Sequence, residues 1–279
     1  IAGIQIARPK WIIMIEPGQA FWLALVQGLT EFLPVSSSAH LVLLPILADW
    51  PDQGLAFDVA VHVGTLGAVV VYLRRDLVGI AAGWFGQWGS GGKTEESRMG
   101  WLLIVATVPA GVVGFFLDET VELLLRHPLV IAAATIGFAV LLWWADRYRS
   151  EARALSDLGF RGAVLIGVFQ ALALIPGTSR SGITITAGLM LGLSREAAAR
   201  FSFLMAIPII AAAGCFKAVS LMQSEDAVLW NLFALGVAVA FLSAWAVIAL
   251  FLRFISRVGM TPFVLYRIAL GSILLILFW

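Results

Sequence analysis

The most reactive side chains of this apolar sequence are gathered in one short stretch, EFLPVSSSAH at residues 31–40. It contains the carboxylate of Glu31, the hydroxyl of Ser37 and the imidazole of His40, which stands three residues beyond Ser37 on the same helical face. Together with the guanidinium of Arg180, these groups supply a nucleophile, a base or acid, and an electrophilic clamp. That is the set of groups that acyl or phosphoryl transfer requires.

A second polar stretch, GTSRSG at residues 177–182, carries groups suited to binding an anion. The guanidinium of Arg180 binds two phosphate oxygens at once through its planar fork and does not lose its charge. Short helices are expected over 38–48 and 182–191, directly after the two polar stretches, and the free N–H groups at a helix N-terminus attract anions. These features predict a phosphate site at Arg180. The hydroxyl groups expected to share in it are those of Ser36, Thr178, Ser179 and Ser181.

Glu31 lies four residues after Gln27, so both side chains project from one face of a helix about one turn apart. A carboxylate inside a membrane is costly unless it is paired, hydrated or bound to a metal. We therefore interpret Glu31 as a metal ligand or as a base that activates a hydroxyl, with the neutral oxygen of Gln27 as a weaker ligand for a hard cation. The plainer alternative is that Glu31 is only a structural ion-pair partner of Arg180.

Two other residues with reactive side chains receive structural interpretations. His62 is expected five residues into a membrane crossing, close to an interface, so at most it would lie behind the catalytic groups. Cys215 is the single cysteine and cannot form an internal disulfide. Because it lies in an apolar run, we interpret it as a packing residue.

The elements that position these groups must be membrane helices. Of the 279 residues, 61% are hydrophobic and only 13% are charged, against about 25% charged in a soluble domain. The composition predicts an all-α polytopic membrane protein with a single membrane domain over residues 1–279, of which 1–18 form a tail. The net charge is +1 and the basic residues are scattered through short loops, which argues against a nucleic-acid partner. Membrane lipids are the expected surroundings.

Six stretches of the sequence are predicted to cross the membrane. A spanning helix needs ~17–25 mostly apolar residues, and cytoplasmic loops are enriched in Lys and Arg. Both rules together predict crossings at 57–73, 101–117, 128–145, 201–217, 229–252 and 262–279. The regions 19–48 and 161–195 are left over, and the charge pattern requires each to enter and leave on the same side. Each is therefore expected to be a re-entrant hairpin of two short helices.

The two hairpins resemble each other in sequence. Each contains a glutamine, a proline and a serine in the same order, Gln27, Pro34 and Ser37 in the first and Gln170, Pro176 and Ser179 in the second. The chain is therefore expected to be an inverted-topology repeat of about 19–145 and about 161–279, with its site where the hairpins meet at mid-membrane. Each proline is expected to end a helix. Irregular backbone at membrane depth must be buried or line water, so the polar tips should face each other across a wet cavity.

Three motifs carry a resemblance to a known family: QGLTE at 27–31, FLPVSSSAH at 32–40 and PGTSRSGIT at 176–184. Their order and sequence resemble the undecaprenyl-diphosphate phosphatases, also called the bacitracin-resistance or BacA family, over nearly the whole chain from about residue 18. The resemblance implies an integral enzyme of the bacterial inner membrane, with its site toward the periplasm. It would hydrolyse a polyprenyl diphosphate to the monophosphate carrier lipid of cell-wall synthesis plus inorganic phosphate.

The resemblance also implies roles for individual residues. Glu31 corresponds to the metal-associated acidic residue, Ser37 to the proposed nucleophile, His40 to a catalytic partner and Arg180 to the phosphate binder. Gln27 fits a family motif that has Glu or Gln at this position. The implied cofactor is a divalent cation, Mg²⁺ or Ca²⁺. The sequence leaves the choice between a monomer and a homodimer open.

A different class of function is compatible with the same hairpins. Secondary transporters are also built as inverted repeats with broken helices. A transporter or flippase of a phosphorylated polyprenyl lipid would use Arg180 and the helix ends without needing Ser37 or His40 to react. The SSSAH cluster beside Glu31 favours catalysis. A second class of lipid phosphatase carries the motifs KxxxxxxRP, PSGH and SRxxxHxxxD. This chain is not assigned to it, because Thr184 stands at the position of the histidine after SR and the lysine motif is missing.

Overall fold

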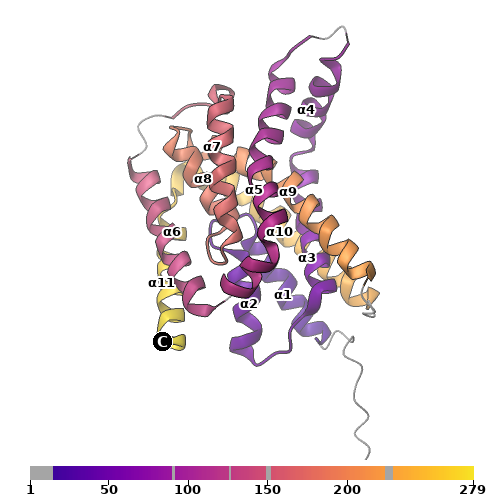
Figure 1. The fold of residues 1–279 in the computed structure, drawn as a ribbon, viewed down its shortest axis with the longest axis vertical. Helices are drawn as coiled ribbons and strands as arrows, with labels where there is room; N and C mark the ends of the chain where they lie inside the picture. Colours follow the sequence, from indigo (N-terminus) through magenta and orange to yellow (C-terminus); the bar gives the residue numbers. More distant parts are fainter. Residues whose placement is uncertain (1–14, 90–91, 126, 149–151, 224–228) are drawn as a thin grey trace, which may run out of the picture.

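The computed structural model describes residues 15–89, 92–125, 127–148, 152–223 and 229–279. Within these ranges the chain is helical and has no β-strand, as Figure 1 shows. The α-helices are α1 (Pro17–Thr30), α2 (Ser37–Ala48), α3 (Gly54–Tyr72), α4 (Arg74–Gly86), α5 (Glu95–Leu125), α6 (Pro128–Tyr148), α7 (Phe160–Ala171), α8 (Arg180–Met190), α9 (Arg195–Gln223), α10 (Trp230–Val258) and α11 (Thr261–Phe278). Two short 3-10 helices, η1 (Leu155–Asp157) and η2 (Leu172–Leu174), complete them.

Six of the described helices are long and apolar enough to cross a membrane, namely α3, α5 up to Phe116, α6, α9, α10 and α11. The predictions of an all-helical chain and of six such segments are therefore confirmed. Several helices are longer than the apolar stretches that predicted them, and α9 has 29 residues where 201–217 was expected. Hydropathy detects the apolar middle of a helix, whereas backbone hydrogen bonding continues through the polar residues at its ends.

Four shorter helices lie in the two regions where hairpins were predicted. With 14, 12, 12 and 11 residues, α1, α2, α7 and α8 are at most ~21 Å long, less than the ~30 Å of a bilayer core. In Figure 1, α1 and α2 lie in the lower half of the molecule, and α7 and α8 lie in the upper half.

The ends of these helices differ from the sequence prediction. Pro34 and Pro176 lie in the turns after the helices, since α1 already ends at Thr30 and α7 at Ala171. A proline also disfavours helical backbone at the residue before it, which moves the helix end upstream. On the other side of the second turn, α8 begins at Arg180, two residues earlier than expected, so Arg180 is the first residue of a helix.

The first short helix begins before residue 19, where it was expected. Residues 1–14 lie outside the part of the chain that the structure describes. Ile15 is buried against α1 and its neighbours, and α1 starts at Pro17. The first hairpin therefore begins two residues before the predicted boundary.

Close helix contacts hold the two hairpins in the bundle. α1 packs on α10 at Gly28, where an added Cβ would lie 2.7 Å from the carbonyl oxygen of Ala240. α7 packs on α5 at Gly167, whose Cα faces the carbonyl oxygen of Ala106 with no room for a side chain. Small residues allow such close approach between membrane helices. Both hairpins are thus docked backbone to backbone on spanning helices.

Candidate active site

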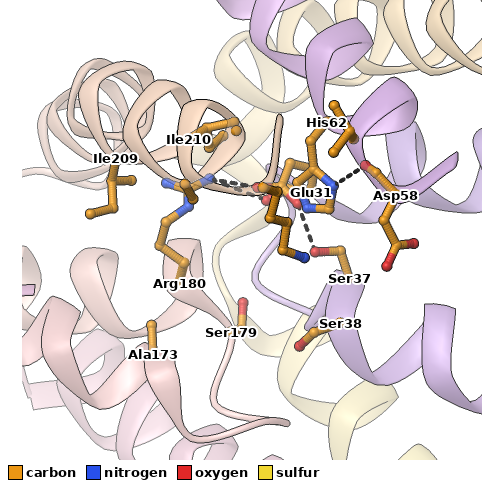
Figure 2. A pocket seen from close by; sticks show the side chains of 14 residues that line it. Glu31, Ser37, Ser38, Asp58, His62, Ala173, Ser179, Arg180, Ile209 and Ile210 are labelled. Atoms are coloured by element: carbon orange, nitrogen blue, oxygen red, sulfur yellow. Dashed lines mark hydrogen bonds and ion pairs between the residues drawn. The ribbon is translucent and has the colours of Figure 1, made fainter. Parts of the chain in front are cut away.

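Glu31 is the centre of the polar contacts between the two hairpins. It follows α1 directly, and the residue is 8% exposed. One carboxylate oxygen, Oε2, accepts hydrogen bonds from Ser37 Oγ at 2.7 Å and from Gln27 Nε2 at 2.9 Å. The other, Oε1, lies 3.3 Å from Nη2 of Arg180, as Figure 2 shows. The second hairpin thus reaches across 149 positions of sequence to the same carboxylate that Ser37 contacts.

The helices α2 and α8 each begin with a residue whose side chain contacts this carboxylate. Ser37 is the first residue of α2 and Arg180 is the first residue of α8. The free N–H groups at a helix N-terminus carry partial positive charge. Two such ends therefore lie near one buried anion, and a guanidinium contacts it. The same surroundings would favour a phosphate oxygen.

The residues before these two helices share an unusual backbone. Ser36 has φ 73° and Ser179 has φ 70°, a region that residues other than glycine rarely adopt. Each also has a hydroxyl contact two residues on, Ser36 Oγ to Ser38 Oγ at 3.4 Å and Ser179 Oγ to Ser181 Oγ at 3.3 Å. Strained backbone of this kind is concentrated at functional sites, where surrounding contacts hold it. It gives both hairpins the same sharp entry into the second helix.

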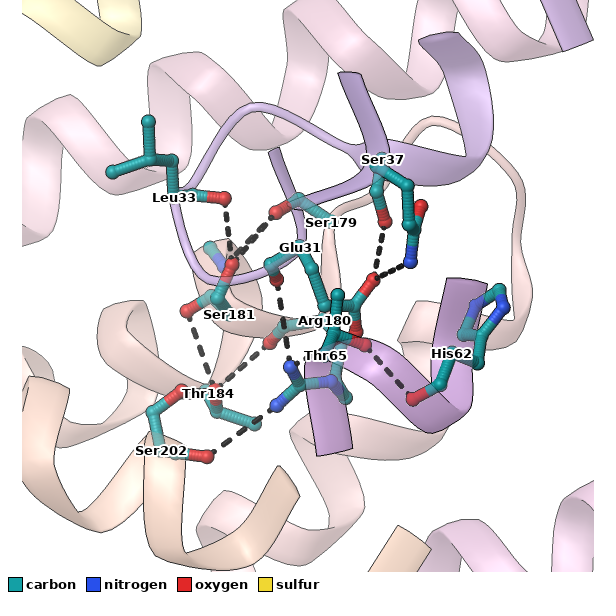
Figure 3. Close-up of polar contacts among 12 residues, drawn as sticks. Glu31, Leu33, Ser37, His62, Thr65, Ser179, Arg180, Ser181, Thr184 and Ser202 are labelled. Atoms are coloured by element: carbon teal, nitrogen blue, oxygen red, sulfur yellow. Dashed lines mark hydrogen bonds and ion pairs between the residues drawn. The ribbon is translucent and has the colours of Figure 1, made fainter. Parts of the chain in front are cut away.

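Further hydrogen bonds tie the turns together, as Figure 3 shows. Ser181 Oγ donates to the carbonyl oxygen of Leu33 at 2.8 Å, which joins the second hairpin to the turn of the first. Thr184 Oγ1 lies 2.7 Å from Ser202 Oγ and thereby holds α8 against α9. The polar tips predicted from the sequence to face each other therefore do so.

The guanidinium of Arg180 is held by long contacts only. Its hydrogen bonds to the carbonyl oxygens of Ser202 and Glu31 are 3.4 and 3.5 Å, and its carbon lies 5.9 Å from the ring centre of Phe32. Both hydrogen bonds are longer than the usual range of about 2.7–3.2 Å. Arg180 can therefore exchange these contacts for the oxygens of an anion at little cost.

A cavity of about 220 Å³ opens beside these groups. Its polar wall comes from α1, α2, α3, α8 and α9, and its apolar wall includes Ile209, Ile210 and Ala213 of α9. The volume is below the roughly 300–1,000 Å³ of pockets that enclose drug-sized ligands. The cavity has room for a small charged group and not for a long chain. The polar residues that line it are Glu31, Ser37, Ser38, Asp58, His62, Ser179, Arg180 and Lys217.

Comparison with known proteins agrees with this arrangement. Residues 20–273 match the family model described as bacitracin resistance protein BacA. The chain belongs to the BacA family. It is 56% identical over 254 residues to an undecaprenyl-diphosphatase of Chromohalobacter salexigens, an alignment that covers 91% of this chain and 96% of the relative. It is 53% identical over 263 residues to undecaprenyl-diphosphatase 2 of Stutzerimonas stutzeri, covering 93% and 97%. Identity to an undecaprenyl-diphosphatase of Nitrosococcus oceani is 54% over 256 residues, covering 92% and 97%.

Family membership confirms the resemblance seen in the three sequence motifs. Together with the six apolar helices, it identifies the chain as a multi-pass membrane protein. The motifs that carried the resemblance are the segments that converge on Glu31 in the structure. In this BacA-family chain the family motifs therefore form one site.

Three of the hydroxyl groups predicted to bind phosphate do not reach the cavity. Ser36, Thr178 and Ser181 are at most 1% exposed and do not line it, whereas Ser179 does. The hydroxyl of Ser181 is directed to Leu33, so it supports the turn from within. Ser38 lines the cavity and was not among the predicted residues.

His40 does not line the cavity either. Its Nδ1 lies 2.7 Å from the carbonyl oxygen of Ser36, and its Nε2 lies 2.6 Å from the hydroxyl of Tyr266 on α11. The two rings stack with their centres 5.7 Å apart. Although His40 is one helical turn from Ser37, its ring is turned toward α11. The sequence could not show which neighbouring helix would attract it.

His62 is the imidazole that the structure brings to the cavity. Its Nδ1 lies 2.7 Å from the carbonyl oxygen of Asp58, and because a carbonyl can only accept, Nδ1 carries the hydrogen. In the tautomer with its hydrogen on Nδ1, the lone pair is on Nε2. The pair Asp58 and His62 is spaced four apart on one helix, a signal that could have been read as one polar face toward the site.

The oxygen atoms of Glu31 and Gln27 fit a divalent cation of the magnesium type. Gln27 is 0% exposed and does not line the cavity. Its side-chain oxygen has no hydrogen-bond partner, and a half-turn of the amide would bring it beside Glu31. Mg²⁺ is typically held by one or two carboxylates together with waters and substrate phosphates. The described residues contain no cluster of three or more His, Cys, Asp or Glu side chains that would hold a metal alone. The donor set therefore suits a cation that arrives with a phosphate.

Cys215 is exposed on α9 and is not a packing residue as predicted. Hydropathy alone does not distinguish the lipid-facing side of an apolar helix from its packed side. Cys215 lies three positions after Ala212 and four before Val219, and all three are exposed, so α9 presents this side outside the bundle. Cys215 plays no part in the site.

Proposed function

We propose that this chain is an integral membrane phosphatase that hydrolyses undecaprenyl diphosphate to undecaprenyl phosphate and inorganic phosphate, and so recycles the carrier lipid of cell-wall synthesis. The observation that carries the proposal is the 2.7 Å hydrogen bond from Ser37 Oγ to the Glu31 carboxylate, with Arg180 on the opposite carboxylate oxygen. The names of the relatives, which are 53–56% identical, support the choice of substrate.

The cavity suits the charged end of such a lipid. A diphosphate group would enter among Arg180, Ser179 and Lys217, while the polyprenyl chain would pass out over the apolar wall at Ile209 and Ile210. A long apolar chain does not need to leave the bilayer for its headgroup to reach such a site. All these residues come from one chain, so the proposal holds for a monomer and for a homodimer alike.

In the proposed reaction, Ser37 attacks the terminal phosphorus. Its hydroxyl hydrogen passes to Glu31, a new Oγ–P bond forms, and the P–O bond to undecaprenyl phosphate breaks, so that this phosphate leaves with the bonding electrons. Phosphoryl transfer depends mainly on positioning and on charge stabilisation. Arg180 and the N-termini of α2 and α8 would supply that stabilisation.

The second step releases the phosphate. A water molecule attacks the phosphorus of the phosphoserine, the Oγ–P bond breaks, and Ser37 recovers its hydrogen from Glu31. The free Nε2 of His62 would accept the hydrogen of the attacking water. We assign His40 a positioning role, because its hydrogen bond to the Ser36 carbonyl supports the strained turn before Ser37.

A divalent cation, Mg²⁺ or Ca²⁺, is part of the proposal. Glu31 and the oxygen of Gln27 would hold it together with the substrate phosphates. When bound, it would supply positive charge to neutralise the diphosphate.

We further propose that the two hairpins are re-entrant and form an inverted repeat of about 19–145 and 161–279 in one membrane domain, in the bacterial inner membrane with the site toward the periplasm. Two features support it. Ser36 and Ser179 have matching backbone and hydroxyl contacts, and each lies nine positions after a buried glutamine, Gln27 or Gln170. In this pairing Ser37 corresponds to Arg180. The comparison of the two sequences had paired Ser37 with Ser179, one residue earlier.

Phosphate release by the purified protein in detergent tests the function. Wild type is expected to release inorganic phosphate from undecaprenyl diphosphate, and Ser37→Ala is expected not to. A transporter or flippase of the phosphorylated lipid needs two compartments and would give no release in detergent. Absence of release by wild type, with and without added Mg²⁺ or Ca²⁺, would therefore favour that alternative.

A further inference from the structure

A second arginine lies beneath the turn that precedes Arg180. Arg267 of α11 is fully buried, with 0% exposure. Its Nη2 donates to two successive carbonyl oxygens of the turn, that of Gly177 at 2.9 Å and that of Thr178 at 2.8 Å. Its Nη1 lies against the first turn of α8, because a Cβ added to Gly182 would be 2.8 Å from it.

Among the described residues, the charge of Arg267 has no counter-ion. None of the ion pairs within the described residues includes it, and its Nε and Nη1 have no hydrogen-bond partner. A buried cation left partly unsatisfied costs free energy, and a packing role could be filled by an apolar side chain at no such cost. Ionisable groups kept inside a membrane protein commonly serve its function.

The contacts of Arg267 with the carbonyl oxygens of Gly177 and Thr178 constrain the backbone directly before Ser179 and Arg180. Directly after Thr178 comes Ser179, whose φ of 70° is strained, and then Arg180 at the start of α8. Carbonyl oxygens held by a guanidinium cannot rotate, so the following peptide units are held too. The uncompensated charge also adds to the positive potential of the α8 N-terminus in a low-dielectric interior.

We propose that Arg267 is the positioning residue of the anion-binding turn: it holds the carbonyls of Gly177 and Thr178, and thereby sets Arg180 and the N-terminus of α8 for the transferring phosphoryl group. The inference rests on the proposed phosphatase function and adds to it a residue that does not touch the cavity. Arg267 acts through Arg180 and does not contact substrate.

The test measures kcat, KM and inhibition by inorganic phosphate for Arg267→Met, Arg267→Gln and Arg267→Lys. Misplacement of a reacting geometry by about 1 Å can lower a rate about 100-fold, and we expect a loss of that order in kcat for Arg267→Met. KM is expected to stay within about threefold, because the lipid chain binds elsewhere. Inhibition by inorganic phosphate should weaken about tenfold, since the turn binds the anion. Arg267→Lys, which keeps the charge and can donate to both carbonyls, should recover part of the rate.

A control separates positioning from stability. Arg195 at the start of α9 is paired with Asp146 at 2.6 Å, away from the cavity. Arg195→Met should lower the thermal stability in detergent without changing the phosphate inhibition. Arg267→Met could behave like Arg195→Met, with kcat per folded molecule and phosphate inhibition as in wild type. That result would show that the inference is wrong.

A second variant tests the contact itself. In Gly182→Ala the new Cβ would lie 2.8 Å from Nη1 of Arg267 and 3.1 Å from the side chain of Ser179, so activity should fall. In the Arg267→Met background, Gly182→Ala should lower the activity less, because the flexible methionine side chain can move away from the new Cβ. Equal losses in both backgrounds would overturn the contact. If wild type releases no phosphate, it is the proposed function that fails, whereas an active wild type with unaffected Arg267 variants refutes this inference alone.

Discussion

The hydroxyl of Ser37 donates a 2.7 Å hydrogen bond to the carboxylate of Glu31. The two residues lie at facing ends of successive short helices, with only the turn of residues 32–36 between them. A serine is a weak nucleophile until a base takes its hydrogen, and a buried carboxylate at this distance can do so. The alternative interpretation of Glu31 as a structural partner of Arg180 explains the ion pair and leaves this hydrogen bond unexplained.

Ser37→Ala is expected to lower phosphate release by at least about 10³-fold, because it removes the hydroxyl that is hydrogen-bonded to Glu31. Ser38→Ala is the matched control, since Ser38 also lines the cavity but makes no hydrogen bond to Glu31. It should keep most of the activity. Trapped radiolabelled phosphate should be found on Ser37 in wild type. Full turnover by Ser37→Ala would show that water or another group attacks directly.

Glu31→Gln is expected to lower kcat by about 10²–10⁴-fold, the range typical for loss of a general base. The amide keeps the size of the side chain and can still accept from Ser37, but it cannot take the hydrogen. Asp58→Asn, at another acidic residue of the cavity, should have a much smaller effect. A pre-steady-state measurement of the rate of the first turnover in Glu31→Gln would check the expected loss. A normal first turnover in Glu31→Gln would contradict the assigned role.

Arg180→Lys is expected to lower kcat/KM by about 10²–10³-fold, because a single ammonium cannot reproduce the planar fork on a phosphoryl group. Arg200, which pairs with Asp76 at 2.8 Å and does not line the cavity, offers a comparison. Arg200→Lys should behave like wild type. The measurement is kcat/KM of Arg180→Lys and of Arg200→Lys. Equal losses in the two variants would indicate a general effect of replacing arginine.

Gln27→Glu is expected to lower the Mg²⁺ concentration needed for half-maximal activity, because a carboxylate is a stronger ligand for a hard cation than an amide oxygen. Treatment with a chelator should abolish the activity of both proteins, and added Mg²⁺ or Ca²⁺ should restore it. Titration of activity with metal provides the measurement. If the titration curves coincide, Gln27 is not a ligand, and if chelation leaves activity intact, the cation is not required.

Much of the fold followed from sequence patterns with a local physical basis. Long apolar segments predicted the six helices that can cross a membrane, because a bilayer imposes a minimum length. Glu31, Ser37 and Arg180 were recognised because charged and polar groups at membrane depth need partners. Their convergence could be expected from the similarity of the two hairpins.

Only the tertiary structure decided which side chains enter the cavity. Helical spacing placed His40 near Ser37, but the hydroxyl of Tyr266 on α11 holds its ring outside, while His62 on α3 lines the cavity instead. Such choices depend on contacts between helices far apart in sequence, which the periodicity of one helix cannot contain. Arg267 illustrates the same limit, since nothing in its own helix indicates the turn at 177–178 that it holds. The sequence by itself determined the helices and the reactive groups, and packing between helices determined their partners.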